Sequence, residues 1–129
     1  MMGLFDFLDD NNKSVIHEWA KSLEKADRAK LNSKFKQLAE MDFALAWGTK
    51  LLQGPIYKSI YKLRTKQTVQ LRPLLCRGPF DNDAEYTLLE GAKEIGKKLT
   101  TGAVQRADKN RDELLANPKR RRNHVLIPL

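Results

Sequence analysis

Two neighbouring segments of this chain alternate strictly between apolar and polar residues. The first reads Tyr61-Lys62-Leu63-Arg64, and the second reads Val69-Gln70-Leu71-Arg72. Successive side chains of a β-strand point to opposite faces, so a period of two predicts two consecutive strands. Their apolar residues form one face that belongs to a core, and the other face is cationic. A polyanionic ligand explains why a small protein would maintain such a face.

The remaining pattern predicts an α+β fold. Ser14 is an N-cap residue for a helix over residues 14–25, and a second helix is predicted for residues 27–41. We expect two N-terminal antiparallel helices packed on a small twisted antiparallel sheet, with a short C-terminal helix and a basic tail. Strands are predicted at 56–64, 68–77 and 86–93, and the last helix at 103–117. Residues 4–8 are open between a short first strand and an apolar lead-in.

Length and charge bound the class of protein. A chain of 129 residues predicts one domain, 1–129, with 119–129 as its basic tail. The net charge of +8 is typical of proteins that bind nucleic acid, an anionic membrane or an acidic protein. No apolar run approaches the roughly 20 residues of a membrane span, so we expect no membrane insertion. The lone Cys76, expected to be buried in a strand, suits a reducing cytoplasm.

Metal and cofactor chemistry finds little support in the residue pattern. His17 and His124 lie far apart in the sequence, and no histidine–cysteine cluster has ligand spacing. His17 is expected to face solvent on its helix. The sequence therefore predicts neither a metal site nor a cofactor.

Basic residues are the remaining candidates for chemistry. A ribonuclease that uses the RNA's own 2′-hydroxyl as nucleophile needs a base, an acid and cations that stabilise the phosphorane, but no metal. Crowded lysines have lowered pKa values and can act as bases, whereas arginine holds phosphate oxygens. The candidate catalytic residues are Lys62, Arg64, Arg72 and Lys93, and the candidate RNA-binding residues are Arg77, Lys97, Lys98, Arg120, Arg121 and Arg122. The alternative is that these residues have no functional role. The strand residues then simply face solvent, and the tail arginines belong to a solvated terminus.

With these motifs in order, the chain resembles the RelE/HigB toxin superfamily, in its phage-derived HigB-like branch. The likeness runs through Phe7-Leu8-Asp9, Glu18-Trp19, Tyr61-Lys62-Leu63-Arg64 and Leu89-Glu90-Gly91-Ala92-Lys93-Glu94 to Ala107 and Leu115. It implies that Lys62 and Arg64 lie on a catalytic sheet face. Arg72 matches a phosphate-binding strand arginine, and Lys93 matches a basic position after the glycine. The chain departs from the branch at Pro73, at Ala92 in place of Asp, and at Glu94 in place of a second Lys.

The resemblance implies the toxin component of a type II toxin-antitoxin system. Such a protein is a ribosome-dependent, metal-independent mRNA endoribonuclease of the cytoplasm, inhibited by a cognate helix-turn-helix antitoxin. The alternative is a non-catalytic RNA- or protein-binding module of the same fold. A peripheral membrane protein is a third possibility, disfavoured because no amphipathic basic helix adjoins the tail. The oligomeric state is left open.

Overall fold

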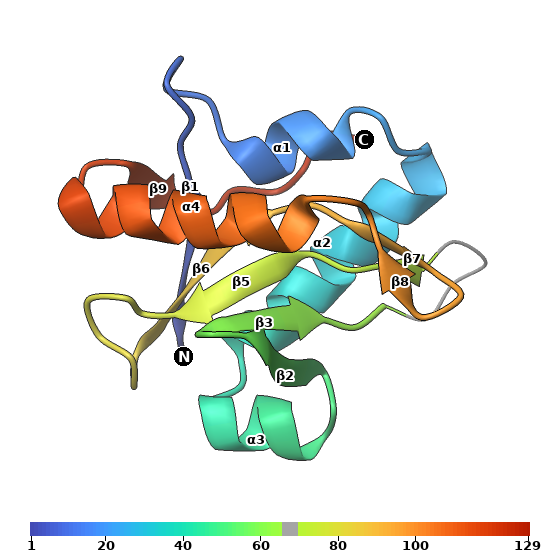
Figure 1. Ribbon diagram of the computed structural model, residues 1–129. Coiled ribbons are helices and arrows are strands. Elements are labelled where there is room, and N and C mark those ends of the chain that lie inside the picture. The colour runs from blue at the N-terminus through green and yellow to red at the C-terminus, as the bar shows by residue number, and fades with distance from the viewer. Residues whose placement is uncertain (66–69) are drawn as a thin grey trace.

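The computed structural model describes residues 1–65 and 70–129, which form a mixed α+β domain with a mostly antiparallel sheet (Figure 1). The predicted α+β class is confirmed. The elements follow in the order β1 (Gly3–Phe7), α1 (Val15–Ala20), α2 (Lys25–Ala39), α3 (Phe43–Gly48), β2 (Leu52–Tyr57), β3 (Ile60–Leu63), β4 (Gln70–Leu71), β5 (Leu74–Arg77), β6 (Glu85–Glu90), β7 (Lys93–Ile95), β8 (Lys98–Leu99), α4 (Ala103–Ala116) and β9 (Arg121–Asn123). Within the described ranges, no helix has the length and apolarity that a membrane crossing requires.

The main sheet has the strand order β2-β3-β5-β6-β1-β9. β1 lies parallel to β6, and every other neighbouring pair is antiparallel. Residues 4–8, left open between two alternatives, thus contribute to an inner strand, and this strand precedes the helices. The first segment of the chain is held between β6 and the strand β9 from the other terminus.

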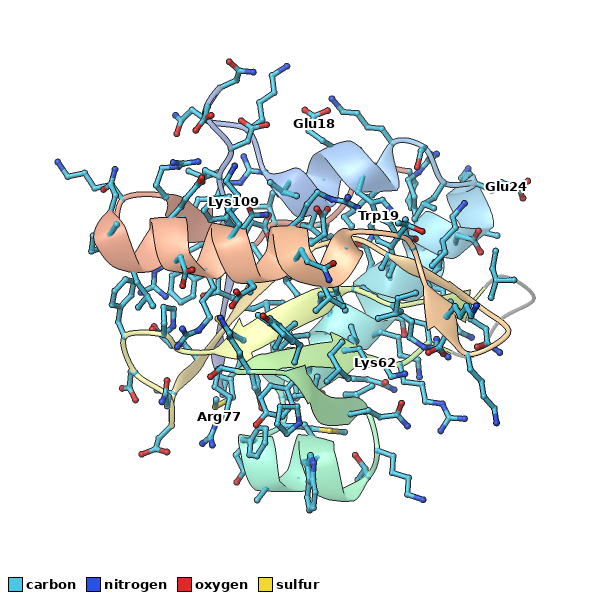
Figure 2. All side chains as sticks on the ribbon, in the orientation of Figure 1. Glu18, Trp19, Glu24, Lys62, Arg77 and Lys109 are labelled. Carbon is cyan, nitrogen blue, oxygen red and sulfur yellow. The ribbon has the colours of Figure 1, made fainter. Side chains whose placement is uncertain are left out.

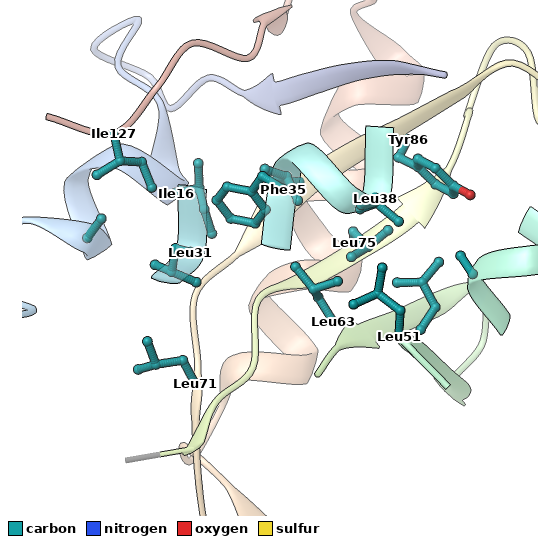
Figure 3. Packing of buried hydrophobic residues seen from close by; sticks show 14 of the residues in the cluster. Ile16, Leu31, Phe35, Leu38, Leu51, Leu63, Leu71, Leu75, Tyr86 and Ile127 are labelled. Carbon is teal, nitrogen blue, oxygen red and sulfur yellow. The ribbon is translucent and has the colours of Figure 1, made fainter. Parts of the chain in front are cut away.

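Helices cover both faces of this sheet (Figure 1). The α2 face is filled by a core that includes Leu31, Phe35, Leu63, Leu75 and Tyr86 (Figure 3). The opposite face packs against α4 through a second core. That core includes Ile60, Leu74, Cys76, Leu89, Ala103, Ala107 and Leu114. The expectation of one apolar and one cationic face is therefore wrong, because the last helix has 14 residues and covers the second face.

The two predicted N-terminal helices are present as α1 and α2, but their expected antiparallel pairing is not confirmed. α1 is short and packs against β1 and β6. Its N-cap is the predicted one, since the Ser14 hydroxyl accepts a hydrogen bond from the His17 backbone N–H at 3.1 Å.

The predicted strand 68–77 is divided at Pro73. Gln70–Leu71 pairs with β7 in a second sheet of order β4-β7-β8, whereas Leu74–Arg77 pairs in the main sheet. Proline has no N–H to donate to a strand partner, so pairing changes at this point. Thr68 and Val69, part of the predicted strand, lie outside the described residues.

A solvated terminus, one of the two alternatives for the tail, is not observed. Arg121–Asn123 pairs with β1, and the His124 N–H donates to the Leu4 carbonyl at 2.9 Å. Further along, Ile127 is buried, and the Asn32 amide bonds to both its N–H and its carbonyl, at 2.8 and 3.0 Å. The unpaired edge of β1 offers backbone partners that a solvated tail would leave unused.

Candidate functional site

Lys62 and Arg72 meet at the carboxylate of Glu94. Lys62 Nζ lies 2.7 Å from Glu94 Oε1, and Arg72 Nε lies 3.1 Å from Glu94 Oε2. Lys62, labelled in Figure 2, extends from β3 of the main sheet, whereas Glu94 belongs to β7 of the small sheet. This cluster of three residues, hereafter the Glu94 centre, therefore lies where the two sheets join.

The Glu94 carboxylate is ionised at neutral pH. The hydrogen bond from Lys62 is the largest influence and lowers the pKa of Glu94 below its usual value of 4.5, against the opposing effect of partial burial. The side chains of Lys62 and Glu94 remain 19% and 12% exposed, so water and small groups reach the pair. The centre thus offers a proton acceptor, an ammonium donor and fixed positive charge within one contact network.

Arg72 does not have the phosphate-binding position that the resemblance implies. Its side chain is 5% exposed. Beyond Glu94, the guanidinium donates to the carbonyls of Thr65 and Leu71 and to the Gln70 amide oxygen, at 2.8 to 3.0 Å. Four of its five N–H groups are therefore used inside the protein. Arg72 positions Glu94.

Arg64 and Lys93 lie apart from this centre. β3 ends at Leu63, so its alternation does not extend to Arg64, which lines a cavity beside α2 and α3. Lys93 pairs with Leu71, whereas Glu94 pairs with Gln70, so the two neighbours point to opposite faces of the small sheet. The four candidate catalytic residues therefore do not share one site, because only Lys62 and Arg72 are brought together.

The cavity at Arg64 gathers further cations. It has a volume of about 420 Å³, and Lys34, Lys50 and Arg64 line it together with polar groups that include Gln37 and Thr49. Within the part of the chain that the structure describes, none of these three cations forms an ion pair. We call this cavity the basic hollow. Its unneutralised charge favours an anionic ligand.

Two of the predicted RNA-binding lysines are accessible, whereas Arg77 has internal partners. Lys97 lies in the turn between β7 and β8, Lys98 begins β8, and both are exposed. The Arg77 guanidinium stacks on the Phe43 ring at 4.0 Å, beside α3 (Figure 2), and lies 3.5 Å from Asp83. Arg77 therefore packs α3 against the sheet.

The tail arginines are mostly used within the fold. Arg120 lies 3.1 Å from Asp10 and 3.3 Å from Glu113. Arg121 pairs with Glu85 at 3.0 Å and stacks on the Phe5 ring at 3.8 Å. Arg122 is more exposed. The first two anchor β9, and only Arg122 retains a surface position.

A second cluster, not predicted from the sequence, surrounds the buried Asp6. Its carboxylate accepts a hydrogen bond from the Ser14 hydroxyl at 2.9 Å and lies 2.7 Å from His124 Nδ1. His17 Nε2 lies 3.5 Å from the same carboxylate and bonds to the Val125 carbonyl at 2.9 Å. The expectation of a solvent-facing His17 is therefore wrong, and Asp6, His17 and His124 bring three metal-ligating side chains together although they are distant in the sequence. One feature of the sequence does indicate a buried polar cluster here: Asp6 is the lone charged residue in the apolar segment Leu4-Phe5-Asp6-Phe7-Leu8, and a buried carboxylate needs polar partners.

The Cys76 thiol is buried, as predicted, and burial raises its pKa to about 11. Because the thiolate is the reactive form, we expect no labelling by dithionitrobenzoate in the native protein at pH 8. One thiol per chain should react after unfolding in guanidinium chloride. Stoichiometric labelling of the native protein at the rate seen for glutathione would contradict the buried position.

Comparison with known proteins found no match: no family model, curated protein or solved structure matches this chain.

Proposed function

We propose that this protein is a toxin-type endoribonuclease of the cytoplasm that cleaves ribosome-bound mRNA without a metal. This proposal rests mainly on the Glu94 centre, in which an ionised carboxylate lies 2.7 Å from an ammonium group and 3.1 Å from a guanidinium group. The order of motifs that resembles the HigB-like branch supports the same function. The proposed partners are the ribosome, mRNA and a cognate helix-turn-helix antitoxin.

The centre contains the groups that such a cleavage needs. Glu94 takes the proton of the RNA 2′-hydroxyl, and the resulting oxygen attacks the adjacent phosphorus. Lys62 donates a proton to the departing 5′-oxygen as its bond to phosphorus breaks. The products are a 2′,3′-cyclic phosphate and a 5′-hydroxyl. Glu94 thus supplies the base at a position where the branch often has a second lysine.

Positive charge around the centre favours RNA binding. Lys97 and Lys98 follow Glu94 on the exposed turn of the small sheet, and the chain carries a net charge of +8. Both side chains are exposed, so their charge is available to a phosphate backbone. RNA that neutralises them releases counterions, so binding weakens as salt increases.

Replacing Lys62 by Ala or Glu94 by Gln is expected to reduce mRNA cleavage by about 10²- to 10⁴-fold, the usual contribution of a general acid or base. Cleavage is measured by primer extension on mRNA in a cell-free translation reaction. The matched control is Lys109→Ala, which removes an exposed lysine of α4 (Figure 2). Circular dichroism verifies that each variant is folded. Wild-type protein that neither arrests translation nor cuts mRNA would exclude this function.

A second candidate function is RNA binding without catalysis, through the basic hollow. The specific observation is that Lys34, Lys50 and Arg64 line one cavity and lack ion pairs within the described ranges. Their charge is available to a ligand, whereas Lys62 and Arg72 share the single negative charge of Glu94.

For this second function, the double variant Lys50→Ala/Arg64→Ala is expected to weaken single-stranded RNA binding and to reduce its dependence on salt. Each lost phosphate contact should lower the slope of log K against log salt by about 0.7. Filter binding at several salt concentrations measures the slope, with Lys109→Ala as control. An unchanged slope would show that the hollow does not contact RNA.

A further inference from the structure

The Asp6 cluster combines residues that are far apart in the sequence. Asp6 belongs to β1, His17 to α1 and His124 to the segment after β9. One ligand atom from each of the three lies within 4.8 Å of the others. In the sheet order, β1 and β9 lie at the edge opposite β2 and β3, so this cluster is separate from the Glu94 centre.

The donor types are those of a transition-metal site. Two imidazole nitrogens and one carboxylate oxygen are a common set for Zn²⁺ and related divalent ions, whereas Mg²⁺ and Ca²⁺ prefer oxygen alone. The Ser14 hydroxyl holds one oxygen of Asp6 at 2.9 Å and thereby fixes the carboxylate. Outer hydrogen bonds of this kind orient metal ligands.

The His124 ring presents Nδ1, and not Nε2, to the Asp6 carboxylate. The His124 side chain is 9% exposed, and its Nε2 is buried with no hydrogen-bond partner in the described residues. Its Nδ1 faces Asp6 Oδ1 at 2.7 Å, and the ring lies against Phe35. Because Nδ1 is the nitrogen that faces Asp6, an ion between Asp6 and His124 would bind Nδ1 in place of this hydrogen bond and would leave Nε2 as it is.

We propose that Asp6, His17 and His124 bind one divalent transition-metal ion, with Zn²⁺ as the probe. The ion joins β1, α1 and the C-terminal segment and so holds the tail on the domain. This role is structural and independent of RNA cleavage. His17 Nε2 is the nitrogen that faces Asp6, so binding of the ion replaces its hydrogen bond to the Val125 carbonyl and leaves the ring proton on Nδ1.

One neighbouring charge opposes the ion. Arg122 Nε lies 3.8 Å from Asp6 Oδ2, and the side chain is 42% exposed. Removing this cation should strengthen metal binding, because like charges repel and a half-exposed arginine contributes little to the core. Arg122→Gln therefore provides a variant that is expected to bind more tightly than the wild type.

The test uses the full chain without an affinity tag, titrated with ZnCl₂ against a chromophoric chelator. We expect one Zn²⁺ per chain. Loss of a residue that only hydrogen-bonds to a metal ligand typically weakens metal binding by about 10- to 100-fold. His17→Gln or His124→Gln removes a ligand itself and should weaken Zn²⁺ binding by more than this. Arg122→Gln should bind more tightly, and Lys109→Ala should match the wild type. Equal affinity of the wild type and His17→Gln would overturn the proposal.

A second measurement does not depend on folded variants. The chain has only two histidines, and the one cysteine is buried, so a ¹⁵N spectrum of the imidazoles reports directly on the site. Stoichiometric Zn²⁺ should shift nitrogen resonances of both rings and raise the melting temperature. Unchanged ring nitrogens in the presence of excess Zn²⁺ would reject the site.

Discussion

Replacing Gly91 by Ala is expected to destabilise the protein by about 3 kcal/mol, at the upper end of the cost of overpacking a well-packed core. A Cβ atom at Gly91 would overlap the indole ring of Trp19. Trp19 extends from α1 and packs beside the first core, and Gly91 directly follows β6 (Figure 2). Because the overlap involves a rigid ring, α1 must move away from the sheet. Urea unfolding measures the free energy.

The cause of this loss is tested by a matched glycine and a double variant. Gly48, at the end of α3, has no atom within 4 Å of an added Cβ. Gly48→Ala should therefore leave the free energy of unfolding unchanged or raise it by at most about 1 kcal/mol. In a Trp19→Leu background, Gly91→Ala should cost much less than in the wild type. Equal costs in both backgrounds would show that Trp19 is not the obstacle.

Replacing Glu94 by Ala is expected to lower the free energy of unfolding by about 3 kcal/mol, because it leaves a buried charge without its partner. Arg72 is 5% exposed and loses the carboxylate that faces its Nε at 3.1 Å. Glu94→Gln retains a polar acceptor and should cost less. The control is Lys109→Ala, whose exposed pair with Glu113 should contribute under about 0.5 kcal/mol. An Ala variant as stable as this control would contradict the role of the Glu94 centre.

The same residue predicts a dependence on pH. The pKa of Glu94 is lower in the folded state than its usual 4.5, so its contribution is fully present above pH 4.5 and is lost as pH falls through the folded value. The difference in stability between the wild type and Glu94→Gln should therefore shrink on acidification below about pH 4.5. Urea unfolding of both proteins from pH 7 to pH 3 measures this difference. Other carboxylates, such as Glu85, titrate in both proteins, so their contributions cancel in the difference in stability.

Local patterns predicted the elements correctly where contacts along the chain decide them. Ser14 caps α1 because its hydroxyl reaches a backbone N–H only three residues away. The alternation around Leu63 and the burial of Cys76 are also confirmed. The last helix was predicted, but the second core was missed because local periodicity does not show which face of the sheet a helix covers.

The site predictions failed where charged groups find partners across long distances in the sequence. Arg72 was expected to face phosphate, yet Glu94, 22 residues away, neutralises it in a buried network. His17 and His124 were judged too distant for a metal site, yet both adjoin Asp6 in the fold. Spacing along the chain carries no information on such pairs.

By itself, the sequence determined that this chain is an α+β domain with a large excess of positive charge, because periodicity and composition depend only on local order and on counting. Which positive charges remain available, and which side chains meet at Asp6 and Glu94, became clear from the folded chain. The physical reason is that an ion pair or a ligand set depends on distance in space, which is set when strands pair and both faces of the sheet are covered.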